Sequence, residues 1–169
     1  MNRGGNALKR KGLTLIELLI TLAVLSIFTA LVLLLMSNYF EKTEKNIKLL
    51  DALRRLNDAG DKMVELLNRA AGPANSVELV SATEVRFDII LAGQKINARV
   101  KVLSETEVQY FEDDRSVLIP IENVQITFQS GSQNPETVLP LKLIVKTPNP
   151  FNPSSLLSLE YSIYPPGVR

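Results

Sequence analysis

The chain has 169 residues, of which 46% are hydrophobic and 6% aromatic, and its 19 basic and 18 acidic side chains give a formal net charge of +1. It contains no cysteine and no histidine, which excludes disulfides, thiol catalysis, histidine general-base catalysis and cysteine-based zinc sites. The nearly balanced charge disfavours a general electrostatic attraction to nucleic acid, and the length suits one modest domain beside an anchor.

The N-terminal third of the sequence begins with a basic segment and continues with an apolar run. Residues 1–12 contain four basic and no acidic side chains, and residues 18–36 contain no charged side chain. A helix of this length crosses a hydrocarbon core of about 30 Å. The positive charge before the run predicts a single pass with the C-terminal region outside the cytoplasm. The run is longer than that of a secretory signal peptide.

The next segment predicts an amphipathic helix. Residues 41–71 contain no proline, and their apolar side chains recur every three or four positions, as on one face of a helix. The stripe consists of Ile47, Leu50, Leu53, Leu56, Met63, Leu66 or Leu67, and Ala70. Gly72-Pro73 is a typical stop signal. We therefore expect a nearly continuous helix from Leu13 to Ala71, with Asn57–Gly60 as a point where it weakens or bends.

After Pro73 the pattern changes to short segments rich in β-branched residues. The predicted strands are Ser76–Val80, Glu84–Ala92, Lys95–Leu103, Glu107–Phe111, Ser116–Ile119, Val124–Gln129, Leu141–Lys146 and Leu156–Tyr164. Turns are predicted at Ala92–Gln94 and Glu112–Arg115, and loops at Ser130–Glu136 and Thr147–Ser155. This spacing predicts an antiparallel sheet whose apolar face packs on the helical stripe, so the expected fold class is α+β.

One motif lies where the basic segment meets the apolar run. Gly12-Leu13-Thr14-Leu15-Ile16-Glu17, with the flanking residues 9–36, resembles the N-terminal signal of type IV pilins and type II secretion pseudopilins. The resemblance implies that a prepilin peptidase cleaves between Gly12 and Leu13, that the new amine of Leu13 is N-methylated, and that Glu17 serves in assembly.

The resemblance also implies how the chain is organised. Its parts are a cleaved basic leader at 1–12, a transmembrane half-helix at 13–40, an amphipathic half-helix at 41–72 and a β-rich globular domain at 73–169. The implied location is the bacterial inner membrane, with the C-terminal domain in the periplasm or outside the cell, or a surface filament. The implied partners are other pilin or pseudopilin subunits, the prepilin peptidase and the inner membrane.

The position of Glu17 beside the apolar run gives a physical reason to expect a functional role for its carboxylate. A carboxylate near the end of a membrane helix is costly to place beside hydrocarbon, and a nearby cation reduces that cost. The resemblance supplies such a cation, the α-amino group of Leu13 in a neighbouring subunit. We therefore expect Glu17 to pair with that amine as the helices of a filament pack, which would fix the register between subunits.

The sequence departs from the main filament subunits of this family in three places. Leu13 replaces the more usual phenylalanine, Leu34 stands where many major pilins have proline, and the paired cysteines near the C-terminus are missing. The last two departures favour a minor pilin or pseudopilin. The segment Ile121–Phe128 has a general likeness to J-type pseudopilins and W-like minor pilins. The expected function is to assemble into, cap or prime a type IV pilus or a type II secretion pseudopilus, without catalytic residues and without a cofactor.

Several alternatives stay open from the residues alone. The chain could be an uncleaved single-span anchor of a small β domain, or a minor pilin for DNA uptake or adhesion. A DNA contact would be expected from a loop such as Lys142–Lys146 rather than from the helical cluster of Lys42, Lys45, Lys48, Arg54 and Arg55, where acidic residues are interleaved. Glu112-Asp113-Asp114 offers oxygen ligands for calcium, but an acidic turn is more often simply solvated.

Overall fold

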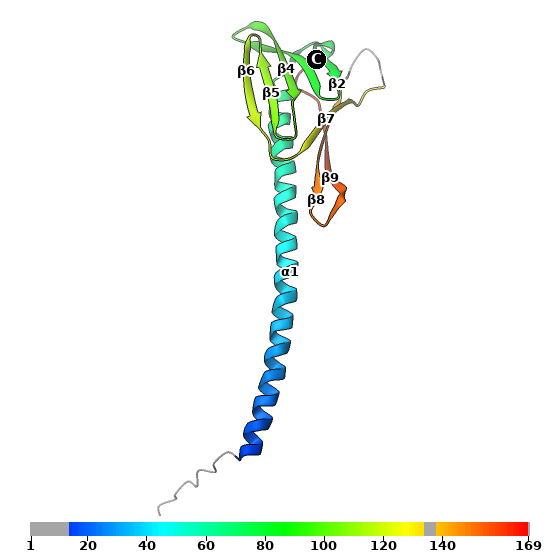
Figure 1. Ribbon diagram of the computed structural model, residues 1–169. Coiled ribbons are helices and arrows are strands. Elements are labelled where there is room, and N and C mark those ends of the chain that lie inside the picture. The colour runs from blue at the N-terminus through cyan, green and yellow to red at the C-terminus, as the bar shows by residue number, and fades with distance from the viewer. Residues whose placement is uncertain (1–13, 134–137, 169) are drawn as a thin grey trace, which may run out of the picture. The chain divides into compact units, whose positions relative to one another are not determined.

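The computed structural model describes residues 14–133 and 138–168 (Figure 1). A single long helix, α1, runs from Leu15 to Leu67 and is followed by short strands. The strands are β1 (Ala71–Gly72), β2 (Val77–Ser81), β3 (Glu84–Leu91), β4 (Gln94–Val102), β5 (Glu107–Glu112), β6 (Arg115–Pro120), β7 (Gln125–Ser130), β8 (Leu141–Asn149), β9 (Asn152–Ile163) and β10 (Gly167–Val168), with the 3-10 helix η1 (Ala74–Ser76) before β2. The chain comprises two compact units, Met1–Glu44 and Lys45–Arg169.

The described strands form two antiparallel sheets and one parallel pair. The orders are β2-β3-β4-β5-β6, β7-β8-β9 and β1-β10. The expected α+β class and the antiparallel pairing are confirmed, and the antiparallel strands divide between two sheets instead of forming one. The connection after β6 buries Ile121 and Val124 in the core instead of pairing with a strand. β7 thereby enters a second sheet, which meets the first through a backbone bond from the Phe128 nitrogen to the Ala82 oxygen (2.7 Å).

The two predicted tight turns are confirmed. Leu91 pairs with Gln94, and Glu112 pairs with Arg115, so each hairpin has a two-residue loop. Ala92 and Gly93 have φ values of 51° and 82°, and Asp113 has a φ of 50°. The two-residue loops that match the twist of antiparallel strands require positive φ. Glycine and aspartate tolerate positive φ better than most residues.

The predicted loop Thr147–Ser155 is mostly strand, which corrects the sequence interpretation. β8 and β9 remain paired up to Asn149 and Asn152. The Asn149 side-chain oxygen accepts a hydrogen bond from the Phe151 backbone nitrogen (2.9 Å), an Asx turn that replaces a longer loop. The prolines in this segment obscured its strand character, because proline normally interrupts a ladder.

The core of the second unit lies between the C-terminal part of α1 and both sheets. Leu56, Met63 and Leu67 of α1 are almost fully buried, and Phe128 of β7 and Val100 of β4 lie in the same cluster. Burying a side chain of this size contributes about 1.5–3 kcal/mol. The end of α1 is therefore held by tertiary packing, which determines where the amphipathic stripe is covered.

Two parts of the helix prediction need correction. Ile47 and Leu50 are 61% and 66% exposed, so the stripe is covered only from about Ala52 onward. The helix also ends at Leu67 rather than Ala71, because Ala71 and Gly72 pair with β10 in a parallel ladder. The helix runs through Asn57–Gly60 without interruption.

Gly60 permits a close contact between α1 and β9. A Cβ atom placed on Gly60 would clash with the Tyr161 hydroxyl oxygen and with two carbons of its ring. The glycine that the sequence marks as a weak point is therefore the position at which an aromatic ring packs against the helix backbone.

We expect Gly60→Ala to destabilise the chain by about 1–3 kcal/mol, because the added methyl must displace Tyr161. This reverses the usual effect, since replacing a glycine within a helix by alanine ordinarily stabilises it by about 0.5–1 kcal/mol. Urea unfolding of the purified chain gives the measurement. Asn57→Ala, at an exposed position one turn away, is the control. Unchanged or raised stability in Gly60→Ala would contradict the contact.

Tyr110 ties β5 to the residues that follow α1. Its hydroxyl donates a hydrogen bond to Glu112 Oε1 (2.8 Å). Arg69 lies 6.0 Å from its ring centroid and 3.9 Å from the same carboxylate oxygen. Burial, followed by the hydrogen bond to Glu112, raises the pKa of Tyr110 from 10.0 to about 12. The neutral hydroxyl is therefore the form that the folded state stabilises.

The raised pKa predicts a loss of stability at alkaline pH. Below pH 10 Tyr110 is neutral in both states, and its contribution is fully present. As the pH rises from 10.0 towards about 12, the unfolded chain releases this proton first, so the free energy of unfolding falls. We expect a steeper decline in the wild type than in Tyr110→Phe, as measured by urea midpoints across this range. Equal slopes would contradict the raised pKa of Tyr110. The pKa of Tyr161 is also raised, but Tyr161 is present in both proteins and so does not affect the comparison.

Candidate functional site

Thr14 and Glu17 form the N-terminal cap of α1. Thr14 immediately precedes the first helical residue, Leu15. Its backbone nitrogen and its hydroxyl both donate to Glu17 Oε2, at 2.9 and 3.0 Å. In return, the Glu17 backbone nitrogen donates to the Thr14 hydroxyl oxygen at 3.3 Å. This reciprocal arrangement is a capping box, which satisfies backbone donors that the first turn of a helix leaves without partners.

The capping box gives Glu17 a role within its own chain that the sequence interpretation missed. The signal was present, since threonine followed three residues later by glutamate is the sequence signature of this cap. Both hydrogen bonds from Thr14 end on Oε2. Among the described residues, Oε1 receives no hydrogen bond. One carboxylate oxygen therefore holds the helix start, while the other makes no hydrogen bond with the part of the chain that the structure describes.

Two of the three predicted site residues cannot be placed. Gly12 and Leu13 lie outside the described residues, and Thr14 is the first residue with a defined position. Cleavage between Gly12 and Leu13 therefore stays a prediction. Glu17 lies in the first turn of α1 and is exposed, as its expected role in assembly requires.

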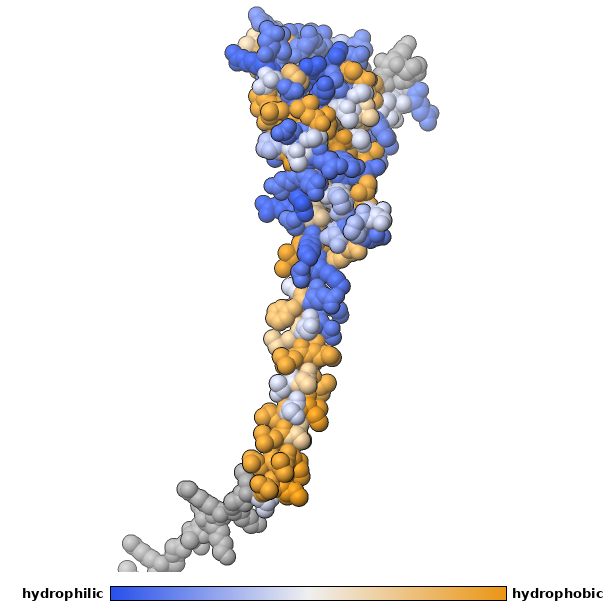
Figure 2. Space-filling view, in the orientation of Figure 1, coloured by the Kyte–Doolittle hydropathy of each residue, from blue (hydrophilic) through white to orange (hydrophobic). Residues whose placement is uncertain are grey.

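The apolar segment after Glu17 is long and hydrophobic enough to cross a membrane. None of its most apolar 18-residue window is buried within the structure, and Figure 2 shows this part of α1 as mainly hydrophobic. Leu25, Phe28 and Leu33 are 59%, 63% and 62% exposed. Side chains of this kind on every face of a helix require lipid or other helices to cover them.

The hydroxyl groups within this segment are satisfied by the helix itself. Thr21, Ser26 and Thr29 each donate to a backbone carbonyl three or four residues earlier, at 2.8 Å in the shortest case for each. Such bonds remove the cost of an unpaired hydroxyl in an apolar environment. These small polar residues therefore do not break the membrane-spanning character of the helix.

The alternative sites considered from the sequence have ordinary structural explanations. Lys142 and Lys146 lie within β8, so the description of this segment as a loop is wrong. Lys142 also pairs with Glu160 at 2.8 Å. Arg54 and Arg55 pair with acidic residues of the same helix, at 3.6 and 2.7 Å. Within residues 14–133 and 138–168, no three acidic side chains gather as a metal site.

Comparison with known protein families matches residues 8–33 to the prokaryotic N-terminal methylation motif. No curated protein and no solved structure gives a significant match to the chain. The matched segment contains Gly12, Leu13 and Glu17 and extends into the apolar part of α1, whereas the β-rich region lies outside it. The chain therefore carries the N-terminal methylation signal of type IV pilin-like precursors, which implies processing by a prepilin peptidase and anchoring in a membrane.

Proposed function

We propose that the chain is a minor pilin-like subunit that assembles into, caps or primes a type IV pilus or a type II secretion pseudopilus. It is held in the bacterial inner membrane by a single span, with the β-rich domain outside the cytoplasm. The prepilin peptidase removes residues 1–12, and the methylated chain then enters a filament. Its role is assembly and not catalysis. The observation that carries this proposal is the methylation motif at residues 8–33.

The exposed apolar helix supports assembly rather than anchoring alone. An anchor needs only enough hydrophobic length to cross the bilayer. This chain also places an acidic residue at the third helical position, where it caps the helix through one oxygen. The cap gives the residue a use even in a simple anchor, but a charged carboxylate at the boundary of the apolar segment stays costly while no cation lies beside it. Pairing with the methylated amine of a neighbouring subunit would offset that cost.

The uninterrupted helix supports a minor subunit. Leu34, at the position where many major pilins have a helix-bending proline, lies inside α1 with regular helix on both sides. The chain has no cysteine, so the disulfide-bounded C-terminal region of many major pilins has no counterpart here. Both features favour a subunit present in few copies.

Fractionation of filaments tests the proposal. The tagged chain is expressed in a bacterium that assembles pilin-like filaments, and in the same strain without its assembly ATPase. We expect a small amount of the chain in the sheared-filament fraction only when the ATPase is present. Confinement to the membrane fraction in both strains, with the filaments themselves intact, would overturn the proposal and favour a simple anchor.

A further inference from the structure

A polar cavity of about 600 Å³ opens on the sheet β2-β3-β4-β5-β6, away from the features discussed above. Its lining includes charged side chains of β2, β3 and β4, the aromatic ring of Phe111 on β5, and the turn after β5. The volume is in the range of small-molecule sites. Its lining is mainly polar, so an apolar ligand would find little surface to cover.

Two arginines lie side by side in this cavity. Arg86 and Arg99 are direct partners in the β3–β4 ladder, an arrangement that like charges ordinarily disfavour. The carboxylate of Glu84 forms an ion pair with each of them, at 3.4 Å from Arg86 and 3.6 Å from Arg99. Neither contact is a short bidentate pair of the kind that saturates a guanidinium group. Both arginines line the cavity and keep guanidinium donors that Glu84 does not use.

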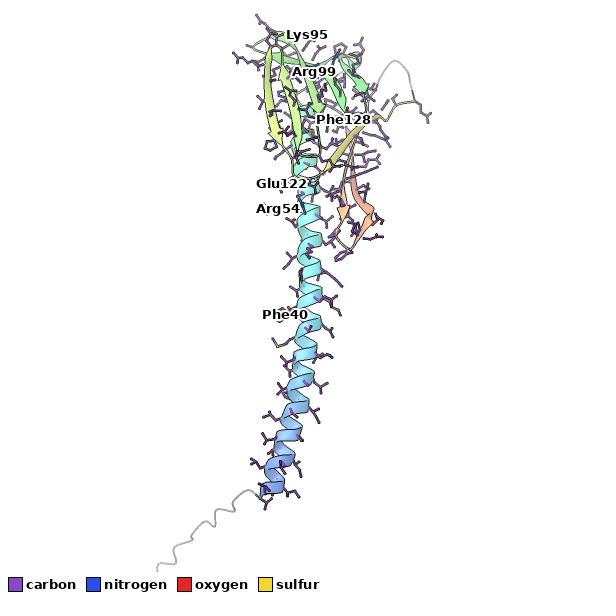
Figure 3. All side chains as sticks on the ribbon, in the orientation of Figure 1. Phe40, Arg54, Lys95, Arg99, Glu122 and Phe128 are labelled. Atoms are coloured by element: carbon purple, nitrogen blue, oxygen red, sulfur yellow. The ribbon has the colours of Figure 1, made fainter. Side chains whose placement is uncertain are left out.

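Phe111 holds one of these arginines in position. The Arg99 guanidinium carbon lies 3.9 Å from the Phe111 ring centroid, which is within the range of a cation–π contact. A stacked guanidinium is planar and restricted, so less freedom is lost when it binds an anion. Arg99 and Lys95, both labelled in Figure 3, belong to β4 and line the cavity.

Hydrogen-bond acceptors lie beside the arginine pair. Asp88 and Asn97 are ladder partners two positions further along β3 and β4, and so about 7 Å from the arginine row. Asp113 adjoins them, since its backbone nitrogen bonds to the Asn97 oxygen at 3.0 Å. Asp88 is 8% exposed and pairs with Lys95 at 2.7 Å. One end of the cavity therefore suits an anionic group, and the other suits hydroxyl donors.

We propose that this cavity binds an acidic saccharide, with the carboxylate of a uronic acid unit on Arg86 and Arg99 and its ring hydroxyls on Asp88, Asn97 and Asp113. The lining has three acidic side chains and three basic ones, so it offers no net positive charge to attract a polyphosphate chain such as DNA. A uronic acid carries one carboxylate and several hydroxyl groups, so it is complementary to both ends of the cavity. The inference is independent of the filament role, because it concerns the β-rich unit alone.

Binding is measured on the purified full chain in a polyoxyethylene detergent, which carries neither sugar nor charge. Methyl glucuronide is titrated while the side-chain Nε–H signals of Arg86 and Arg99 are followed by nuclear magnetic resonance. We expect saturable shifts with a Kd of about 1 mM. Methyl glucoside, which lacks the carboxylate, and acetate, which lacks the ring, should each bind at least about tenfold more weakly.

Variants locate the site. Arg99→Gln and Arg86→Gln should each weaken methyl glucuronide binding by about tenfold or more, whereas Arg54→Gln, which removes the same charge from the exposed face of α1, should not. Should Arg99→Gln fail to fold, Arg86→Gln decides, since Arg86 is half exposed and unstacked. Absence of saturable binding, equal affinity for acetate or methyl glucoside, or wild-type affinity in a folded arginine variant would each overturn the proposal.

Discussion

Glu17→Ala should reduce the amount of the chain in sheared filaments at least about tenfold, while its amount in the membrane stays unchanged. The apolar run needs no help from Glu17 to enter the bilayer, because replacing the carboxylate makes the segment more hydrophobic. The loss would arise at assembly, where the proposed pairing with the amine of a neighbouring subunit is absent. Quantitative immunoblots of filament and membrane fractions give both values.

Glu17→Gln separates the helix cap, which the structure shows, from the proposed charge pairing between subunits. Glutamine still accepts the hydrogen bond from the Thr14 nitrogen, so the capping box is retained, but its charge is lost. If charge pairing between subunits drives recruitment, Glu17→Gln is as defective as Glu17→Ala. Normal incorporation of Glu17→Gln would contradict the pairing and leave the cap as the reason for the residue. Asp58→Asn, an exposed charge removal further along α1, should assemble normally.

Gly12→Val should abolish removal of the leader. The resemblance places the scissile bond directly after Gly12, and a β-branched side chain restricts both the backbone and the space beside that bond. The uncut chain should accumulate in the membrane as a precursor that retains its four leader basic residues. Gel mobility and mass, with and without a coexpressed prepilin peptidase, measure the block.

A matched substitution within the leader controls this experiment. Gly5→Val changes the same residue type at a position away from the proposed cut, and it should leave cleavage unaffected. Complete processing of Gly12→Val would contradict the cleavage site. Failure of the Gly5→Val chain to be cut would show that the substitution disturbs the leader as a whole, and would contradict the specific role of Gly12.

The α+β class and most strands were predictable because their signals are local. Alternation of β-branched residues marked β3, β4 and β5 to within one or two positions, and the turn residues Gly93 and Asp113 marked two hairpins. These features depend on neighbours in the sequence, which is why composition and periodicity suffice.

Features that depend on distant partners were not predictable. The division into two sheets follows from burial of Ile121 and Val124, and the end of α1 at Leu67 follows from pairing between β1 and β10. The sequence predicts a weak point at Gly60, because the residue that explains this glycine, Tyr161, lies about a hundred residues further along the chain. In the candidate site, Glu17 was identified from the motif, but its cap by Thr14 was overlooked although the spacing signals it.

The mass of the mature N-terminus tests the central claim most directly. The chain is purified from membranes of a bacterium that has a prepilin peptidase, and its N-terminal peptide is analysed by mass spectrometry. The proposed function predicts a chain that starts at Leu13 and carries one methyl group on its α-amine. An intact chain that still starts at Met1, with the peptidase active on its own substrates, would contradict it.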